Sequence, residues 1–164
     1  MKSYFYILLL WLPLWLAGCS SVKVHYDRRA DFTSYRTYAY EIRKPVIKGL
    51  NKAEARYMVE QIDAYLQRAG LQASRSHPDL LVGILLDFNE RVDIYNPPYR
   101  WNHRRYRSKE GLVKIDLKDA RTGKVVWTGR FYLRFAHKKE LMQRLDKKLQ
   151  RLFAQFPPTP QKGH

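Results

Sequence analysis

Several short stretches of the chain alternate hydrophobic and polar residues with the period of a β-strand. Residues 22–26 place Val22, Val24 and Tyr26 on one side, and residues 35–40 are rich in Tyr and Thr. Such alternation is typical of strands with one buried face, and Tyr and Thr favour strands. The same reasoning predicts further strands over residues 80–88, 112–118 and 125–135.

Residues 80–88 form an almost uninterrupted apolar run, as expected of a strand at the centre of a sheet or buried on both faces. Residues 112–118 and 125–135 are predicted to pair as a hairpin. The residues between them, 119–124, have turn chemistry, and Gly123 suits a position with positive φ. The core face of the second strand is predicted to hold Val125, Trp127, Phe131, Leu133 and Phe135.

Residues 51–70 and 137–156 change to the helical period. In the first segment, Asn51 and Glu54 have capping-box spacing, and Gly70 suits the left-handed position that ends a helix. In the second segment, two prolines after residue 156 end the pattern. The second helix is predicted to bury an apolar stripe made of Leu141, Met142, Leu145, Leu149, Leu152, Phe153 and Phe156.

The order β-β-α-β-β-β-α predicts an α+β fold. We expect a two-layer sandwich in which an antiparallel sheet of about five strands carries two helices on one face. In that arrangement Trp127 of the sheet and Leu145 of the second helix face one another's layer.

The N-terminal residues 1–18 consist of Lys2, an apolar run and small residues. The run contains Pro13 and is shorter than the roughly 20 apolar residues of a membrane-spanning helix, so it is typical of a cleaved signal peptide. Residues 16–19 (Leu-Ala-Gly-Cys) resemble the lipobox of bacterial lipoproteins, in which the thiol receives a diacylglycerol. Cys19, the only cysteine, is therefore the predicted lipidation site, and a buried free cysteine is the alternative.

The predicted organisation has four parts. Residues 1–18 form a signal peptide that is removed, 19–21 the lipidated anchor, 22–158 a single periplasmic α+β domain, and 159–164 a flexible tail. In lipoproteins of double-membraned bacteria, Ser20 rather than Asp after the cysteine implies sorting to the outer membrane. We therefore expect a location on its periplasmic face, with covalent lipid on Cys19, such as palmitate, and no other cofactor.

The composition adds a strong positive charge to this picture. Lys and Arg number 31 against 15 Asp and Glu, which gives a net charge of +16, and 45% of the residues are hydrophobic. A hydrophobic share of this size excludes a disordered basic tail. Lys2 is the only charged residue in the signal segment, so the predicted mature domain keeps a charge of +15.

A basic aromatic loop is predicted between Tyr95 and Lys109, and it contains no acidic residue. Arginine side chains suit phosphate and carboxylate oxygens, and aromatic rings stack on sugars or lie at membrane interfaces. The helix over residues 137–156 has comparable charge, but its lysine-rich face is explained by solvation. The candidate anion-binding residues are therefore Arg100, Trp101, Arg104, Arg105 and Arg107. A solvated loop tip is the simpler alternative.

Motifs of enzymes and metal sites are missing from the sequence. The five histidines form no metal-binding spacing, and there is no G-x-S-x-G or phosphate-binding glycine loop. Asp87, Glu90 and Asp93 could place carboxylates at a strand end, as in glycan-cleaving enzymes, although solvated strand ends are the simpler interpretation. The sequence therefore predicts no metal and names no catalytic residue, and it leaves open whether the protein is an enzyme.

Four short motifs follow one another behind the lipobox: residues 27–32 with 35–38, residues 78–82, residues 119–129, and residues 156–158. In this order they resemble the bacterial lipoprotein family called domain of unknown function 4136. The resemblance spans nearly the whole mature chain. It implies a fold and a location in the cell envelope, but no activity and no catalytic residues.

Three functions remain open from the sequence. The first is a non-enzymatic membrane-anchored lipoprotein whose periplasmic domain binds or braces against anionic envelope components, such as anionic lipid, lipopolysaccharide or peptidoglycan, or contacts other envelope proteins. The second is an accessory hydrolase of envelope glycans. The third is a nucleic-acid binder with a false signal peptide, because a basic domain of pI about 10.1 would suggest nucleic acid in the cytosol. Behind a lipobox, nucleic acid is not the expected partner.

Overall fold

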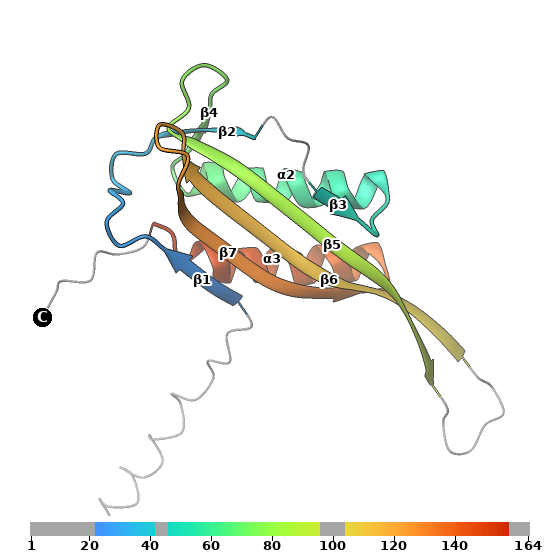
Figure 1. The fold of residues 1–164 in the computed structure, drawn as a ribbon. Helices are drawn as coiled ribbons and strands as arrows, with labels where there is room; N and C mark the ends of the chain where they lie inside the picture. Colours follow the sequence, from blue (N-terminus) through green and yellow to red (C-terminus); the bar gives the residue numbers. More distant parts are fainter. Residues whose placement is uncertain (1–21, 42–45, 96–103, 158–164) are drawn as a thin grey trace, which may run out of the picture.

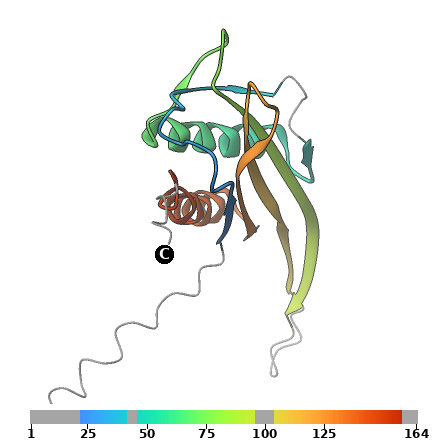
Figure 2. The same cartoon turned by 60° about the vertical axis from the view of Figure 1, so that its left-hand side comes forward.

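The computed structural model describes residues 22–41, 46–95 and 104–157, and it describes residues 93–95 and 104–106 by their backbone only. A twisted sheet forms one layer and two helices form the other (Figure 1). Both helices cover the same face of the sheet and leave the opposite face open, which is seen from the side in Figure 2. The α+β sandwich expected from the sequence is therefore confirmed.

The strands are β1 (Val22–Tyr26), β2 (Thr37–Tyr40), β3 (Val46–Lys48), β4 (Gln72–Ala73), β5 (Leu80–Tyr95), β6 (Arg104–Asp119) and β7 (Val125–Phe135). The helices are α2 (Lys52–Arg68) and α3 (Lys138–Phe153). In the sheet the strands have the order β1-β7-β6-β5-β2-β4, and β3 also pairs with β5. β5 lies at the centre of the sheet, which is one of the two positions that its apolar run predicts.

The sheet is mixed and has seven strands, so the prediction of an antiparallel sheet of about five strands is wrong in these two respects. β1, β5, β6 and β7 pair antiparallel, whereas β2 and β3 pair parallel with β5, and β4 pairs parallel with β2. The parallel pairs arise because α2 lies between β2 and β5 in the chain and returns it to the same end of the sheet. β3 and β4 are two or three residues long and carry too little alternation to be recognised from sequence.

Local sequence accounts for the limits of α2. The side chain of Asn51 accepts a hydrogen bond from the N–H of Glu54 (2.9 Å), and the Glu54 carboxylate accepts one from the N–H of Asn51 (3.0 Å). This capping box satisfies backbone donors that the helix leaves unpaired. After the helix, Gly70 has φ of 89°. The predicted start and end of this helix are confirmed.

The core lies between the two layers. Trp127 of β7 and Leu145 of α3 are both fully buried, so their predicted positions are confirmed. The indole ring of Trp127 stacks on Phe153 of α3, with ring centroids 5.8 Å apart. The two helices are joined by Tyr65, whose hydroxyl donates to Asp146 Oδ1 (2.7 Å).

Two residues assigned to the core by pattern are exposed. Val125 is 46% exposed, because a β-bulge between Leu117 and Lys118 shifts the register at the start of β7 and turns Val126 inward instead. Met142 is 42% exposed. Its neighbour Leu141 is buried against the sheet, and successive residues of a helix point in different directions. These two assignments are corrected by the structure.

Candidate anion-binding surface

The predicted anion-binding residues fall partly outside the described residues. Cys19, Arg100 and Trp101 lie outside them. Arg104 and Arg105 belong to β6 and pair with Tyr95 and Ile94 of β5, and their side chains are not described. Of the five candidate anion-binding residues, Arg107 has a described side chain, and it is exposed on β6.

The expected loop between Tyr95 and Lys109 is strand at residue 95 and at residues 104–109, and residues 96–103 lie outside the described residues. β5 continues to Tyr95 and β6 begins at Arg104, so each strand has 16 residues. The pattern hid this extension, because beyond Asn89 neither face is covered and hydrophobic residues no longer alternate with polar ones. The basic residues from Arg104 onward therefore belong to a paired arm.

This β5–β6 arm projects from the body of the domain. β3 pairs with β5 only as far as Asp87, and β7 pairs with β6 only as far as Lys109. Within the described residues, each strand of the arm beyond these points pairs with the other strand alone. Figures 1 and 2 show the arm extending past the helices.

The first described residue, Val22, is at the end of β1 that is nearer the arm. β7 runs toward the arm from Val125 to Phe135, and β1 lies antiparallel to it, with Val22 opposite Phe131. β1 therefore runs away from the arm, and both ribbon views show its start on the side nearer the arm. The predicted lipid attachment site precedes Val22 by three residues.

A basic groove lies between the outer edge of β7 and α3. β1 pairs with β7 only over residues 127–131, so the next residues of β7 have no strand on that side among the described residues. The groove has a volume of about 290 Å³. It is lined by Glu110, Tyr132, Leu133, Arg134, Arg144, Lys147, Lys148 and Arg151.

Five of the eight lining residues are cationic and one is acidic. Glu110 forms an ion pair with Arg91 (3.0 Å), and Arg144 forms one with Glu140 of the same helix (2.5 Å). Burial lowers the pKa of Lys148, and the neighbouring Arg151 lowers it further. The groove is therefore a region of positive potential.

Sequence reasoning missed this groove. The strand pattern places Arg134 outside the core, and the helix pattern does the same for Arg144, Lys147, Lys148 and Arg151. The sequence explains the basic face of this helix by solvation and gives Arg134 no role, because nothing in it shows how far along β7 the pairing with β1 extends. The available signals were the alternation along β7 and the apolar stripe of α3. They show which residues point outward, but they do not show that the two outward faces lie close together.

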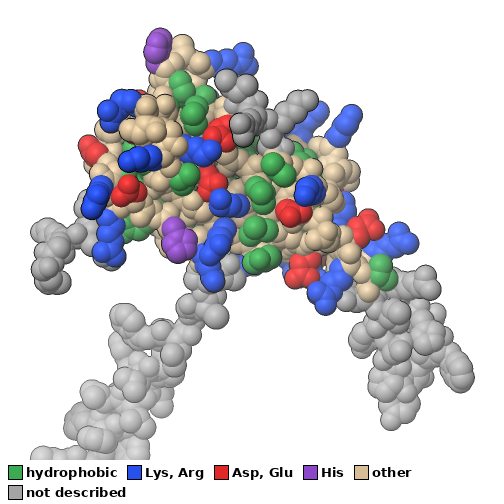
Figure 3. Space-filling view, in the orientation of Figure 1, with side chains coloured by type: hydrophobic (Ala, Val, Ile, Leu, Met, Phe, Trp, Pro, Cys, Tyr) green, Lys and Arg blue, Asp and Glu red, His purple; other side chains and the backbone are tan. Residues whose placement is uncertain are grey.

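The open face of the sheet carries both signs of charge. Figure 3 shows hydrophobic side chains among Lys, Arg, Asp and Glu on this face. Ion pairs join Lys118 to Glu41 and Lys114 to Asp116 (2.7 Å). Unlike the groove, this face has much of its charge neutralised by pairing.

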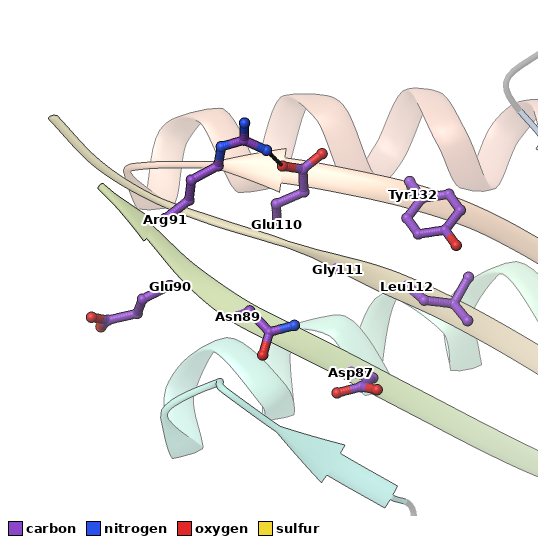
Figure 4. Close-up of a pocket in the computed structure, with 8 residues that line it drawn as sticks. All are labelled: Asp87, Asn89, Glu90, Arg91, Glu110, Gly111, Leu112 and Tyr132. Atoms are coloured by element: carbon purple, nitrogen blue, oxygen red, sulfur yellow. Dashed lines mark hydrogen bonds and ion pairs between the residues drawn. The ribbon is translucent and has the colours of Figure 1, made fainter. Parts of the chain in front are cut away.

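A hollow of about 600 Å³ on the open face is lined by carboxylates. Their side chains do not converge on one point. Figure 4 shows Glu110 turned toward Arg91, Asp87 at the other side of the hollow, and Glu90 extending away. Asp87 and Glu90 lie three residues apart on one strand, so their side chains leave on opposite faces. The side chain of Asp93, the third predicted carboxylate, is not described.

The described residues contain neither a metal-binding cluster nor a membrane-crossing helix. No group of three or more His, Cys, Asp or Glu side chains there could hold a metal ion. Neither helix in these parts of the chain has the length and hydrophobicity of a membrane-crossing segment.

The motifs that suggested a family meet at the end of the sheet opposite the arm. Asp79 Oδ2 accepts hydrogen bonds from the N–H of Arg36 (2.9 Å) and of Thr37 (2.8 Å), and from the Thr37 hydroxyl (2.9 Å). These donors lower the pKa of Asp79 because they favour its charged form. The carboxylate thus fixes the start of β2 beside the start of β5.

A second carboxylate and an aromatic cluster complete this end. Asp119 accepts hydrogen bonds from the N–H of Thr122 (2.7 Å) and the hydroxyl of Tyr35 (3.0 Å), and the Thr122 bond is the main cause of its lowered pKa. Phe32 contacts Tyr35 and Phe156 edge to face, each at 5.9 Å between centroids. These motifs therefore stabilise this end of the fold.

Solved structures of low sequence identity share this fold. A PDZ domain protein from Parabacteroides distasonis has 18% identity over 85% of this chain, with a TM-score of 0.55, and this chain spans 36% of that protein. A neuraminyllactose-binding hemagglutinin homolog from Helicobacter pylori has 11% identity over 83% of this chain and 91% of its own, with a TM-score of 0.53. The PelC dodecamer from Paraburkholderia phytofirmans has 12% identity over 81% and 94%, with a TM-score of 0.51.

At these identities the likeness shows the fold alone. No curated protein matches the chain by sequence. The model of a family described as a domain of unknown function, DUF4136, matches residues 22–158, which include every residue of the core described above. The chain therefore belongs to the DUF4136 family.

Proposed function

We propose that this protein is an outer-membrane lipoprotein with a non-catalytic periplasmic domain that binds anionic components of the cell envelope. A diacylglycerol on Cys19 anchors it, and the basic arm and its tip make the contacts. The observation that carries the proposal is the shared location of three features. Along β7, the start of β1 lies opposite Phe131, the groove is lined by residues 132–134, and the arm begins beyond Phe135.

This location matters because the anchor would orient the domain. Lipid chains on Cys19 would hold the start of β1 close to the membrane surface, so the arm end would face the envelope and the family motifs would face away. The net charge of +16 favours anionic partners, such as lipid headgroups, lipopolysaccharide phosphates and peptidoglycan carboxylates.

A binding partner would stabilise the arm. An isolated two-stranded hairpin is only marginally stable in water, and here Val92 near the end of the arm is 51% exposed. Arg107 lies opposite Val92 on the neighbouring strand. Apolar and cationic side chains side by side suit an interface between hydrocarbon and headgroups.

The anchor is tested by the variant Cys19→Ser. We expect this change to abolish labelling by a fatty-acid analogue and to release the protein from the membrane fraction or leave it as uncleaved precursor. The physical reason is that serine lacks the thiol that receives the lipid. Labelling and fractionation that equal those of the native chain would reject the lipoprotein assignment.

The arm is tested by replacing Arg104, Arg105 and Arg107 together with Gln. All core residues lie within residues 22–156, so a chain that starts at Ser20 keeps the whole core and is suitable for binding measurements. Each basic residue near an anionic surface contributes about 1 kcal/mol, so the triple variant should bind anionic vesicles roughly a hundredfold more weakly.

The matched control replaces Arg28, Arg29 and Arg121 with Gln. These arginines lie in turns at the opposite end of the domain and are exposed, so the control removes the same charge from a surface that would face away. Equal losses in the two triple variants would show that net charge alone drives binding, and the arm would then lose its assigned role.

A further inference from the structure

The groove between β7 and α3 lies within reach of the predicted lipid anchor. Cys19 precedes Val22 by three positions, and an extended chain spans at most about 3.6 Å per residue, so their Cα atoms lie within about 11 Å of each other. Val22 is opposite Phe131, and the next two residues of β7, Tyr132 and Leu133, line the groove. Headgroups around the anchor would therefore lie beside the groove.

The cations of the groove suit a phosphate. Arginine forks bind phosphate oxygens in pairs, and lysine adds a mobile point charge. Arg134 donates from Nε to the hydroxyl of the buried Ser108 (3.2 Å), which holds its guanidinium at the groove. Among the described residues, neither Lys147 nor Arg151 forms an ion pair.

The aromatic residue of the groove also suits a membrane surface. Tyr132 is 68% exposed, the largest exposure among the large hydrophobic residues of the described chain that are exposed. Tyrosine is enriched where hydrocarbon meets headgroups, because its ring is apolar and its hydroxyl is polar. A soluble phosphate would make no use of such a ring.

We propose that this groove is a binding site for the phosphate group of an anionic lipid headgroup, in the same membrane that holds the Cys19 anchor. The proposal rests on the proposed function and adds to it a ligand class and a second contact besides the arm. The volume of about 290 Å³ is at the lower limit of small-molecule sites, so it admits a headgroup but not an entire lipid.

The anchor makes a weak site sufficient. Once the domain is tethered, headgroup binding becomes intramolecular, and its effective concentration depends on the length of the tether. A tether of three residues keeps the groove at the surface. Measurements without the anchor are therefore needed to detect the affinity of the groove itself.

The test uses the chain that starts at Ser20 and vesicles made of equal parts of phosphatidylglycerol and phosphatidylcholine. The groove variant replaces Lys147 and Arg151 with Gln, and both positions are exposed and outside the core. We expect it to bind these vesicles about 30-fold more weakly than the native chain, because two cations at the surface are lost. Vesicles of phosphatidylcholine alone should bind neither chain.

The matched control replaces Arg121 and Lys124 with Gln. These residues belong to the turn before β7, and nine residues of strand, about 30 Å, separate that turn from Arg134. This exceeds the Debye length of about 8 Å at physiological ionic strength, so the control should lose less than about threefold. An equal loss in both variants, or none in the groove variant, would overturn the groove site.

Two further outcomes separate the possibilities. If the native chain binds neither phosphatidylglycerol vesicles nor lipopolysaccharide nor peptidoglycan, the proposed function itself fails. Native binding to the vesicles with an unaffected groove variant removes only the groove. Inorganic phosphate, added at the concentration of accessible lipid phosphate, should not displace the protein from vesicles. Displacement would show that the site accepts free phosphate and would overturn the lipid assignment.

Discussion

Replacing Trp127 with Ala is expected to lower the free energy of unfolding by about 3–5 kcal/mol. Trp127 is fully buried and packs between the sheet and α3, where its ring lies 5.8 Å from that of Phe153 and 5.6 Å from that of Phe156. The ring also covers Gly129, at which an added Cβ would overlap it. Alanine would leave a cavity that these neighbours cannot fill. Urea unfolding followed by far-ultraviolet circular dichroism measures the loss.

Two other variants test the reason for this loss. Trp127→Phe should cost less, because it keeps a ring and removes the indole N–H, which is buried without a hydrogen-bond partner in the described structure. Val125→Ala should cost no more than about 0.5 kcal/mol, since Val125 is exposed. A larger cost at Val125 than at Trp127 would contradict the bulged register of β7, because a slip of one residue exchanges the two faces.

Replacing Gly49 with Ala is expected to cost at least about 3 kcal/mol for two separate reasons. Gly49 has φ of 71°, where a residue with a Cβ loses about 1–2 kcal/mol. In addition, the new Cβ would overlap the carbonyl oxygen of Phe88 and lie 2.6 Å from its carbonyl carbon. Because both atoms belong to the backbone of the central strand, they cannot move aside as a side chain could.

Gly123→Ala is the matched control for this prediction. Gly123 also has φ of 71°, but no atom lies within 4 Å of the position of an added Cβ. Its variant should therefore show only the conformational cost of about 1–2 kcal/mol. The difference between the two variants measures the collision with Phe88. Equal losses would mean that β3 does not pack against β5 as described.

Local patterns in the sequence determined most of the elements. Alternation identified β1, β6 and β7, an apolar run identified β5, and Tyr and Thr content identified β2. The spacing of Asn51, Glu54 and Gly70 identified the limits of α2. Both signals are local, because a strand repeats every two residues and a cap needs residues three apart. The order of these elements also predicted the α+β sandwich, and four short motifs predicted the family.

Local patterns failed where pairing between distant segments decides the outcome. The parallel addition of β2 to β5 depends on the path of the chain through α2, and the exposure of Val125 depends on a bulge opposite it. The arm was interpreted as a loop because a hairpin with both faces exposed has no hydrophobic alternation. In each case a residue's environment is set by a partner strand that its own neighbours in sequence do not specify.

The candidate sites divide in the same way. The sequence by itself determined the lipidation motif at Cys19, the positive charge and the basic residues near the arm, because each of these is a property of neighbouring residues. Only the tertiary structure decided that Arg134 shares a groove with α3 and that the start of β1 lies beside it. The reason is that, among the described residues, β1 pairs with β7 only over residues 127–131 and leaves the next residues of β7 beside the helix. This is a fact about the length of contact between two strands that are far apart in the chain.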